Sequence, residues 1–298
     1  RLLKGLSLTA GFRATYEHQV GGYRSDASLQ PSIFGLMMNG SANLLNAVSD
    51  GKITASESYY SWVGRVALNY LFKKNNIYAS VSRGRRPGVV IVLPGEVTRL
   101  KPEIIYSYEV GMKGIVGNGK LSYDLSAYYY DWTHFQTTTL QQVEGSLAPQ
   151  YLADDAGKAH TFGAEAGFRY SPVRSFSLFG NYSYIDGQFN AEDENGNPQE
   201  YAGNRFRLTP KHTFSAGIDV DVPVSKRANV YFRPSYSYKS QVYFEDSNRA
   251  DLSQPGYGLA NFTAGIRVSA RNFYYEIGSF GKNVFDKKYI IDAGNSGD

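Results

Sequence analysis

Residues 161–170 read Thr-Phe-Gly-Ala-Glu-Ala-Gly-Phe-Arg-Tyr, so apolar and polar positions alternate without a break. Phe162, Ala164, Phe168 and Tyr170 occupy one set of alternate positions, and Glu165 and Arg169 belong to the other. Because successive side chains of a β-strand point to opposite faces, this stretch predicts a strand with one apolar face and one polar face.

The same alternation recurs in 6–17, 62–72, 106–113, 214–222 and 262–268, and none of the six stretches places a charge on its apolar face. The 31 Gly and 11 Pro residues are scattered, which leaves little room for helices. We expect an all-β chain of eleven strands, at 5–17, 58–72, 77–84, 104–114, 121–134, 159–170, 176–186, 210–222, 228–243, 259–268 and 273–282. Pro234 lies inside the ninth strand and predicts a bulge or a sheet edge there.

The connections between these strands alternate in length. Short ones fall at 73–76, 115–120, 171–175, 223–227 and 269–272, and long ones at 18–57, 84–103, 135–159, 187–209 and 245–258. Every other connection therefore lies at the same end of the sheet. Outer-membrane β-barrels have short periplasmic turns and long extracellular loops, with aromatic girdles at both interfaces. Tyr16, Tyr70, Tyr170 and Tyr236 near strand ends fit such girdles, although Tyr also favours any sheet.

Composition excludes several classes of protein. The chain has 298 residues, 31 Lys and Arg against 27 Asp and Glu, and no Cys. The positive charge is not gathered in a stripe, so we expect no nucleic-acid partner. Cys-based zinc sites, disulfides and thiol nucleophiles are excluded. No apolar run approaches the roughly 20 residues of a membrane-spanning helix, whereas a barrel strand needs only about ten alternating residues.

Neither catalysis nor a resident cofactor is expected from the residues. No Ser/His/Asp arrangement or carboxylate pair stands out, so we predict no enzyme, no metal site and no cofactor. Asp193, Asn195 and Asn197 have the spacing of a calcium loop, but Pro198 replaces the required Gly. An acidic turn is the simpler interpretation, and a loop-bound Ca²⁺ is the alternative. Gly114 to Lys120 imitates a phosphate-binding loop, but Asn118-Gly119 predicts a hairpin turn.

Four blocks of sequence resemble motifs of the TonB-dependent outer-membrane receptors. They are Gly281-Lys282-Asn283-Val284-Phe285-Asp286-Lys287-Lys288-Tyr289, then Tyr78-Ala79-Ser80-Val81-Ser82-Arg83-Gly84-Arg85-Arg86-Pro87, then Leu100-Lys101-Pro102-Glu103 followed by 108–114, and Gly163-Ala164-Glu165-Ala166. They occur in the family's order and span nearly the whole chain. One departure is Arg85, which stands where an aromatic residue is usual.

The resemblance implies an antiparallel up-and-down transmembrane β-barrel of about 22 strands with a plugged lumen. Residues 1–298 would form part of one barrel domain, its C-terminal half, with the plug and early strands outside it. Because eleven is odd and 293–298 reads as a loop, we also expect a final strand beyond the chain.

The implied function is active transport across the outer membrane of a Gram-negative bacterium. Extracellular loops would bind a scarce ligand, most simply a ferric siderophore, which is then imported with energy transmitted by TonB. The expected partners are outer-membrane lipid, an N-terminal plug domain of the same protein, and TonB through that N-terminal part. A passive porin-like channel, a glycan-importing receptor of the same family and a soluble β-sheet binding protein are the alternatives.

Two sets of residues are candidates for this function. Around the loops, positively charged side chains would attract an anionic siderophore or lipopolysaccharide phosphate, and a solvated loop is the alternative. Aromatic side chains there would form a ligand platform, and packing within the loops is the alternative. The loop candidates are Arg83, Arg85, Arg86, Arg99, Trp132, Tyr151, Tyr201, Tyr243 and Phe244. On the polar strand faces, interspersed charges would hold a plug or line a water-filled pore: Arg13, Arg65, Glu109, Lys113, Asp124, Glu165, Arg169, Asp219, Arg233 and Arg267.

Overall fold

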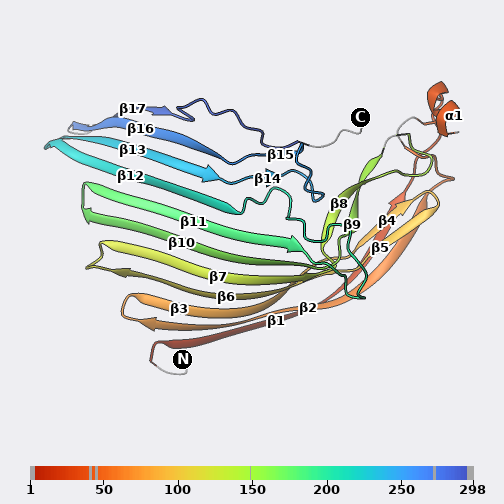
Figure 1. Ribbon diagram of the computed structural model, residues 1–298, viewed down its shortest axis with the longest axis horizontal. Coiled ribbons are helices and arrows are strands. Elements are labelled where there is room, and N and C mark those ends of the chain that lie inside the picture. The colour runs from red at the N-terminus through yellow and green to blue at the C-terminus, as the bar shows by residue number, and fades with distance from the viewer. Residues whose placement is uncertain (1–3, 40–41, 44–45, 148, 271–272, 294–298) are drawn as a thin grey trace.

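The computed structural model describes residues 4–39, 42–43, 46–147, 149–270 and 273–293, and within them eleven long strands form one antiparallel sheet (Figure 1). Each strand pairs with its predecessor among these eleven, so the sheet is an up-and-down meander. Its strands are β1 (Leu6–Tyr23), β2 (Ile53–Phe72), β3 (Asn75–Arg86), β6 (Glu103–Val116), β7 (Leu121–Thr133), β10 (Ala159–Val173), β11 (Phe176–Phe189), β12 (His212–Ser225), β13 (Ala228–Lys239), β16 (Tyr257–Ala270) and β17 (Phe273–Gly281).

The remaining elements belong to the loops. Three small hairpins pair β4 (Val89–Leu93) with β5 (Glu96–Leu100), β8 (Gln136–Gln141) with β9 (Gln150–Asp155), and β14 (Val242–Tyr243) with β15 (Ser253–Gln254). Helix α1 (Ile33–Asn39) lies in the loop between β1 and β2. In the part of the chain that the structure describes, no helix is long and apolar enough to cross a membrane.

The strand register keeps the two faces of the sheet distinct. Val110 of β6, for example, stands opposite Ala79 of β3 and Ala127 of β7, so apolar residues meet apolar residues across the ladders. We call this side the apolar face and the other the polar face. The apolar face is not covered: Phe12 is 73% exposed. A sheet that leaves its hydrophobic side uncovered is suited to contact with lipid rather than water.

The connections are sorted between the two ends of the sheet, as the sequence predicted. Figure 1 shows the tight turns at one end, hereafter the turn end, and α1 with the three small hairpins at the other, the loop end. The link at 269–272 is described only as far as Ala270, and most of the loop expected at 293–298 lies outside the described residues. At the turn after β6, Asn118 and Gly119 have φ of 57° and 90°, which confirms a hairpin turn.

The prediction for Pro234 was wrong. β13 is an interior strand, between β12 and β16, and Pro234 stands opposite Phe262 in regular register. On the β12 side the ladder lapses opposite Arg233 and Pro234 and resumes at Val220↔Phe232 with no shift in register. Proline lacks the N–H that this ladder needs, and the sheet tolerates a local gap instead of inserting a residue. The strand expected over 228–243 is shorter than predicted and ends at Lys239.

Candidate ligand-binding site at the loop end

A cluster of aromatic rings anchors the loops where β7 and β11 end. Trp132 meets the rings of Phe135 and Phe206 edge-on, with centroids 5.9 and 5.7 Å away. Phe189, only 1% exposed, packs 5.2 Å from Phe206. Trp132 therefore serves as packing beneath the loops, which was one of the two roles expected for it.

Buried polar side chains tie separate loops together. Gln136 of β8 is 4% exposed, and its amide donates hydrogen bonds to the carbonyl oxygens of Pro87 (2.9 Å) and Lys101 (3.0 Å). Asp246 accepts hydrogen bonds from Thr137 Oγ1 (2.5 Å) and the backbone N–H of Arg207 (3.1 Å). The loops after β3, β7, β11 and β13 are thus joined into one structure.

A cavity of about 770 Å³ opens between these loops. It brings together three of the predicted aromatic residues, Tyr151, Tyr201 and Phe244. The charged residues of its wall are mostly carboxylates, with one arginine: Asp154, Glu200, Glu245, Asp246, Asp292 and Arg207. Phe244 is buried, whereas Tyr151 is 57% exposed. A space of this size lies in the range of small-molecule sites, roughly 300 to 1,000 Å³.

A second cavity, of about 390 Å³, adjoins the first through Asp154, Glu200 and Tyr201. Arg99 and His134 lie in its wall. Burial and the Glu200 carboxylate raise the pKa of Tyr201 to about 12. The neighbouring carboxylate thus favours the protonated hydroxyl, whose single O–H is directed at Glu200, and the exposed part of Tyr201 that faces the cavities is mainly its ring.

The four predicted arginines do not form one open patch. Arg85 is paired with Glu17 and its side chain is 9% exposed. Arg86 donates to the Gln136 carbonyl oxygen (3.1 Å), and Arg99 pairs with Glu57 (3.2 Å). Arg83 lies on the apolar face, stacked on Trp62. Each guanidinium has its own environment, and anion binding by these residues stays a prediction.

The last of the predicted loop residues, Tyr243, lies apart from the others. Tyr243 is outside the linings of both cavities, and the Arg205 guanidinium carbon lies 6.0 Å from the centre of its ring. Sequence reasoning missed the loop anchors Gln136, Phe206 and Asp246. Neither an isolated Gln nor an isolated Asp in a loop carries a local signal, because its partners come from distant parts of the chain.

The ten predicted polar-face charges do share one face by register. Near the turn end, Arg233 pairs with Asp219 and Arg267 with Asp221, both at 2.9 Å. Some of the others have local partners: Arg169 donates to Ser177 (2.8 Å) and Glu109 accepts from Tyr78 (2.7 Å). Within the described residues, four form no side-chain hydrogen bond or ion pair: Arg13, Lys113, Asp124 and Glu165. They remain available to another surface.

Comparison with known proteins places this geometry in a family. The family model for the TonB-dependent receptor-like β-barrel matches residues 1–284, so the chain belongs to the TonB-dependent receptor β-barrel family. Members of this family are transport receptors of the Gram-negative outer membrane, and that is where the sheet lies. The expected all-β, antiparallel up-and-down fold is confirmed.

Solved structures resemble the chain over nearly its whole length. The ferric yersiniabactin uptake receptor FyuA from Yersinia pestis matches 98% of it with a TM-score of 0.75 and 18% identity. The ferric preacinetobactin receptor BauA from Acinetobacter baumannii matches 96%, with a TM-score of 0.63 and 20% identity. The ferric-catecholate import receptor Fiu from E. coli K12 matches 100%, with a TM-score of 0.68 and 17% identity. The chain spans 40%, 37% and 40% of their respective lengths.

Proposed function

We propose that this chain is the ligand-gathering part of a receptor that imports a ferric siderophore, with energy supplied through TonB. The observation that carries the proposal is the cavity of about 770 Å³ at the loop end, built on a family fold whose solved examples include ferric siderophore receptors. The cavity lies on the side where outer-membrane barrels have their extracellular loops.

The residues of the cavity have distinct roles in this proposal. Tyr151 and Tyr201 supply ring surface, Tyr151 also supplies a hydroxyl donor, and Phe244 supplies apolar surface. The carboxylates around them favour a ferric complex that presents hydroxyl groups or protonated amines to this wall. Arg99, Lys101 and Arg207 are nearby cations for anionic groups of the same ligand.

The polar face has a second role, in holding a plug. Arg13, Lys113, Asp124 and Glu165 have no side-chain partner within the described residues, and a plug domain of the same protein would supply complementary groups. TonB would then act on that plug to release the ligand inward. We expect no catalysis at any of these positions.

The test is uptake of radioactive iron by cells that produce the intact protein and lack other ferric-siderophore receptors. Ferric complexes with cationic, neutral and anionic surfaces are compared one by one. Tyr201→Ala combined with Tyr151→Ala should reduce uptake of the accepted complex by tenfold or more. The matched control, Tyr274→Ala, removes an exposed tyrosine from β17, far from the loops.

Energy dependence separates this proposal from its alternatives. Transport should stop when the proton gradient of the inner membrane is collapsed or TonB is deleted. Uptake that persists without energy indicates a passive channel. Cells that take up no ferric complex, but gain growth on oligosaccharides, indicate a glycan-importing receptor. Either result would reject the siderophore proposal.

A further inference from the structure

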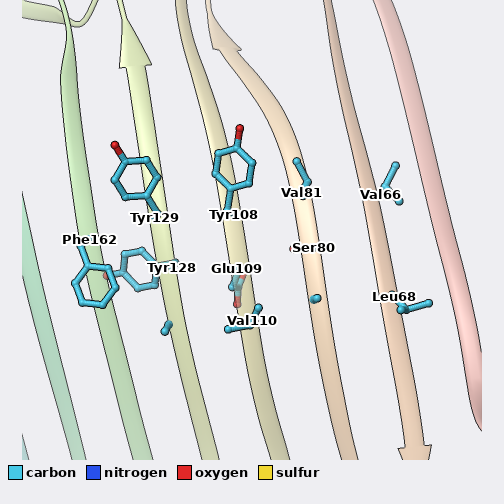
Figure 2. A pocket seen from close by; sticks show the side chains of 12 residues that line it. Val66, Leu68, Ser80, Val81, Tyr108, Glu109, Val110, Tyr128, Tyr129 and Phe162 are labelled. Atoms are coloured by element: carbon cyan, nitrogen blue, oxygen red, sulfur yellow. The ribbon is translucent and has the colours of Figure 1, made fainter.

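The apolar face carries a groove across β2, β3, β6, β7 and β10. Figure 2 shows its wall, with Val66 on one side, Phe162 on the other, and Val81 and Val110 between them. Its volume is about 510 Å³. Ala79 and Ala127, the cross-strand neighbours of Val110, are too small to fill the surface and so leave it hollow.

The groove continues toward the turn end. A second hollow of about 520 Å³ shares Leu68, Ala79, Val110 and Ala127 with the first and extends to Ile77. From Val81 to Ile77 the two hollows follow β3 for about 13 Å, at roughly 3.3 Å per residue. The two hollows thus form one apolar depression in the sheet surface, long enough along the strands to take part of a hydrocarbon chain.

A cation lies at the loop-side end of this groove. Arg83 is two residues beyond Val81 on the same face of β3. Its guanidinium carbon lies 4.3 Å from the centre of the Trp62 ring, and its Nε donates to Tyr106 Oη at 3.2 Å. A second guanidinium nitrogen of Arg83, Nη1, donates a hydrogen bond to the Trp62 carbonyl oxygen. Among the described residues no carboxylate forms an ion pair with Arg83, so its charge is not neutralised.

Other polar side chains lie near Arg83 on the same face, at the level expected for lipid headgroups. In Figure 2 the hydroxyls of Tyr108 and Tyr129 point along the strands toward the loop end. His160 stacks 6.4 Å from Tyr129, and its Nδ1 lies 2.6 Å from Asn190 Oδ1. Asp131, opposite Tyr106 and His160 in the ladders, is the nearest carboxylate on this face by register. Tyr and Trp rings collect at such membrane boundaries.

We propose that this groove and Arg83 bind one phosphorylated lipid of the outer leaflet. Its acyl chain lies in the groove, and its phosphate lies against the guanidinium. The loop end faces the cell exterior, which puts Arg83 at the headgroup level of that leaflet. A planar guanidinium is well suited to phosphate oxygens, and the apolar groove next to it along β3 selects an amphiphile over free phosphate. The site is independent of the siderophore proposal.

The experiment uses the intact protein, purified in mild detergent and examined by native mass spectrometry after titration with lipid A. Diphosphorylated lipid A and its dephosphorylated form are compared. We expect the unmodified protein to retain the phosphorylated form at least tenfold better. Equal retention of the two forms would overturn the proposal, and this comparison needs no variant.

Variants then locate the site. Arg83→Gln should reduce retention of the phosphorylated lipid about tenfold and leave the dephosphorylated one unchanged, whereas Ala127→Phe, which fills the groove, should reduce both. Arg249→Gln, at a loop arginine paired with Asp251, is the control and should change neither. Folding of each variant is checked by heat-modifiable gel mobility. Retention unaffected by both Arg83→Gln and Ala127→Phe in folded protein would contradict this placement of the lipid.

Discussion

At the scale of single residues, Asp193 shows how one carboxylate orders a loop. Its oxygens accept hydrogen bonds from the backbone N–H groups of Asn195 (2.8 Å) and Asn197 (2.9 Å) and from the Asn197 side-chain amide (3.0 Å). The carboxylate therefore acts as the centre of a tight acidic turn, which was the simpler of the two interpretations of this segment.

These bonds predict a pH dependence of the loop. The Asn197 side chain, followed by the Asn197 N–H, lowers the pKa of Asp193 below its ordinary value of 3.8. The stabilisation is thus complete above that value and is lost as the pH falls through the lowered pKa. Hydrogen-exchange protection of the Asn195 and Asn197 amides should fall over this acidic range. In Asp193→Asn, which does not titrate, the protection should not vary with pH.

A second residue-scale prediction concerns glycine beneath an aromatic ring. On the polar face the ring of Tyr128 lies over Gly163, and a Cβ at that position would overlap the ring. Gly163→Ala must displace the Tyr128 ring and so disturb its stacking on Tyr130, whose ring centroid is 4.6 Å away. We expect a loss of about 1 to 3 kcal/mol in the free energy of unfolding. Gly11→Ala is the control, because a Cβ there meets no atom within 4 Å; equal losses in urea titrations would contradict the account.

At the scale of elements, the two faces of one strand should respond differently to the same charge. Leu125 of β7 is on the apolar face, opposite Met112 and Ala166, and is 41% exposed. Leu125→Arg should destabilise the protein in bilayers, by about 2 to 4 kcal/mol if the residue lies near the midplane. Ser126→Arg points to the polar face beside Glu165 and should have little effect. Similar losses for both variants, in folding titrations with lipid vesicles, would reverse the assignment of the faces.

The strands were predictable because alternation is a local signal. All eleven were found, and the errors lie at their ends. β1 extends to Tyr23 and β2 begins at Ile53, beyond the predicted ends at 17 and 58. There Val20 and Gly22 pair with Ser56 and Thr54, and the alternation of apolar and polar residues has faded. The ladder continues by cross-strand hydrogen bonds, which sequence periodicity does not reveal.

The candidate site was predictable only in part. The sequence showed which loops are long and which aromatic residues they contain, and three of these, Tyr151, Tyr201 and Phe244, line one cavity. It grouped Arg83 with Arg85 and Arg86 because they are adjacent in the chain. Arg83 is instead stacked on Trp62 on the apolar face, Arg85 is taken up by its ion pair with Glu17, and the side chain of Arg86 has the opposite parity to both.

At the scale of the whole molecule, the sheet and the loop assembly are stabilised by different contacts. Ladders and the apolar face maintain the sheet, whereas bonds between loops far apart in the chain maintain the cavity. Asp246 is central to the second set, because it joins Thr137 of β8 to Arg207 and lies in the cavity wall. Asn204 Nδ2 also donates to its carbonyl oxygen at 2.9 Å.

This separation predicts that loop contacts can be broken without unfolding the sheet. Thr137→Val removes the hydroxyl donor to Asp246 at a buried position outside the cavity lining, so any effect on ligand binding must act through the shape of the loops. We expect affinity for the accepted ferric complex to fall about tenfold, while the unfolding midpoint of the sheet in guanidinium chloride stays unchanged. Thr138→Val, the neighbouring residue in the same hairpin, lines the cavity but has no bond to Asp246, and should alter affinity less. The opposite outcome is that Thr137→Val lowers the unfolding midpoint as much as Gly163→Ala does. The loops and the sheet would then unfold as one cooperative unit, in which a destabilised contact anywhere lowers the stability of the whole.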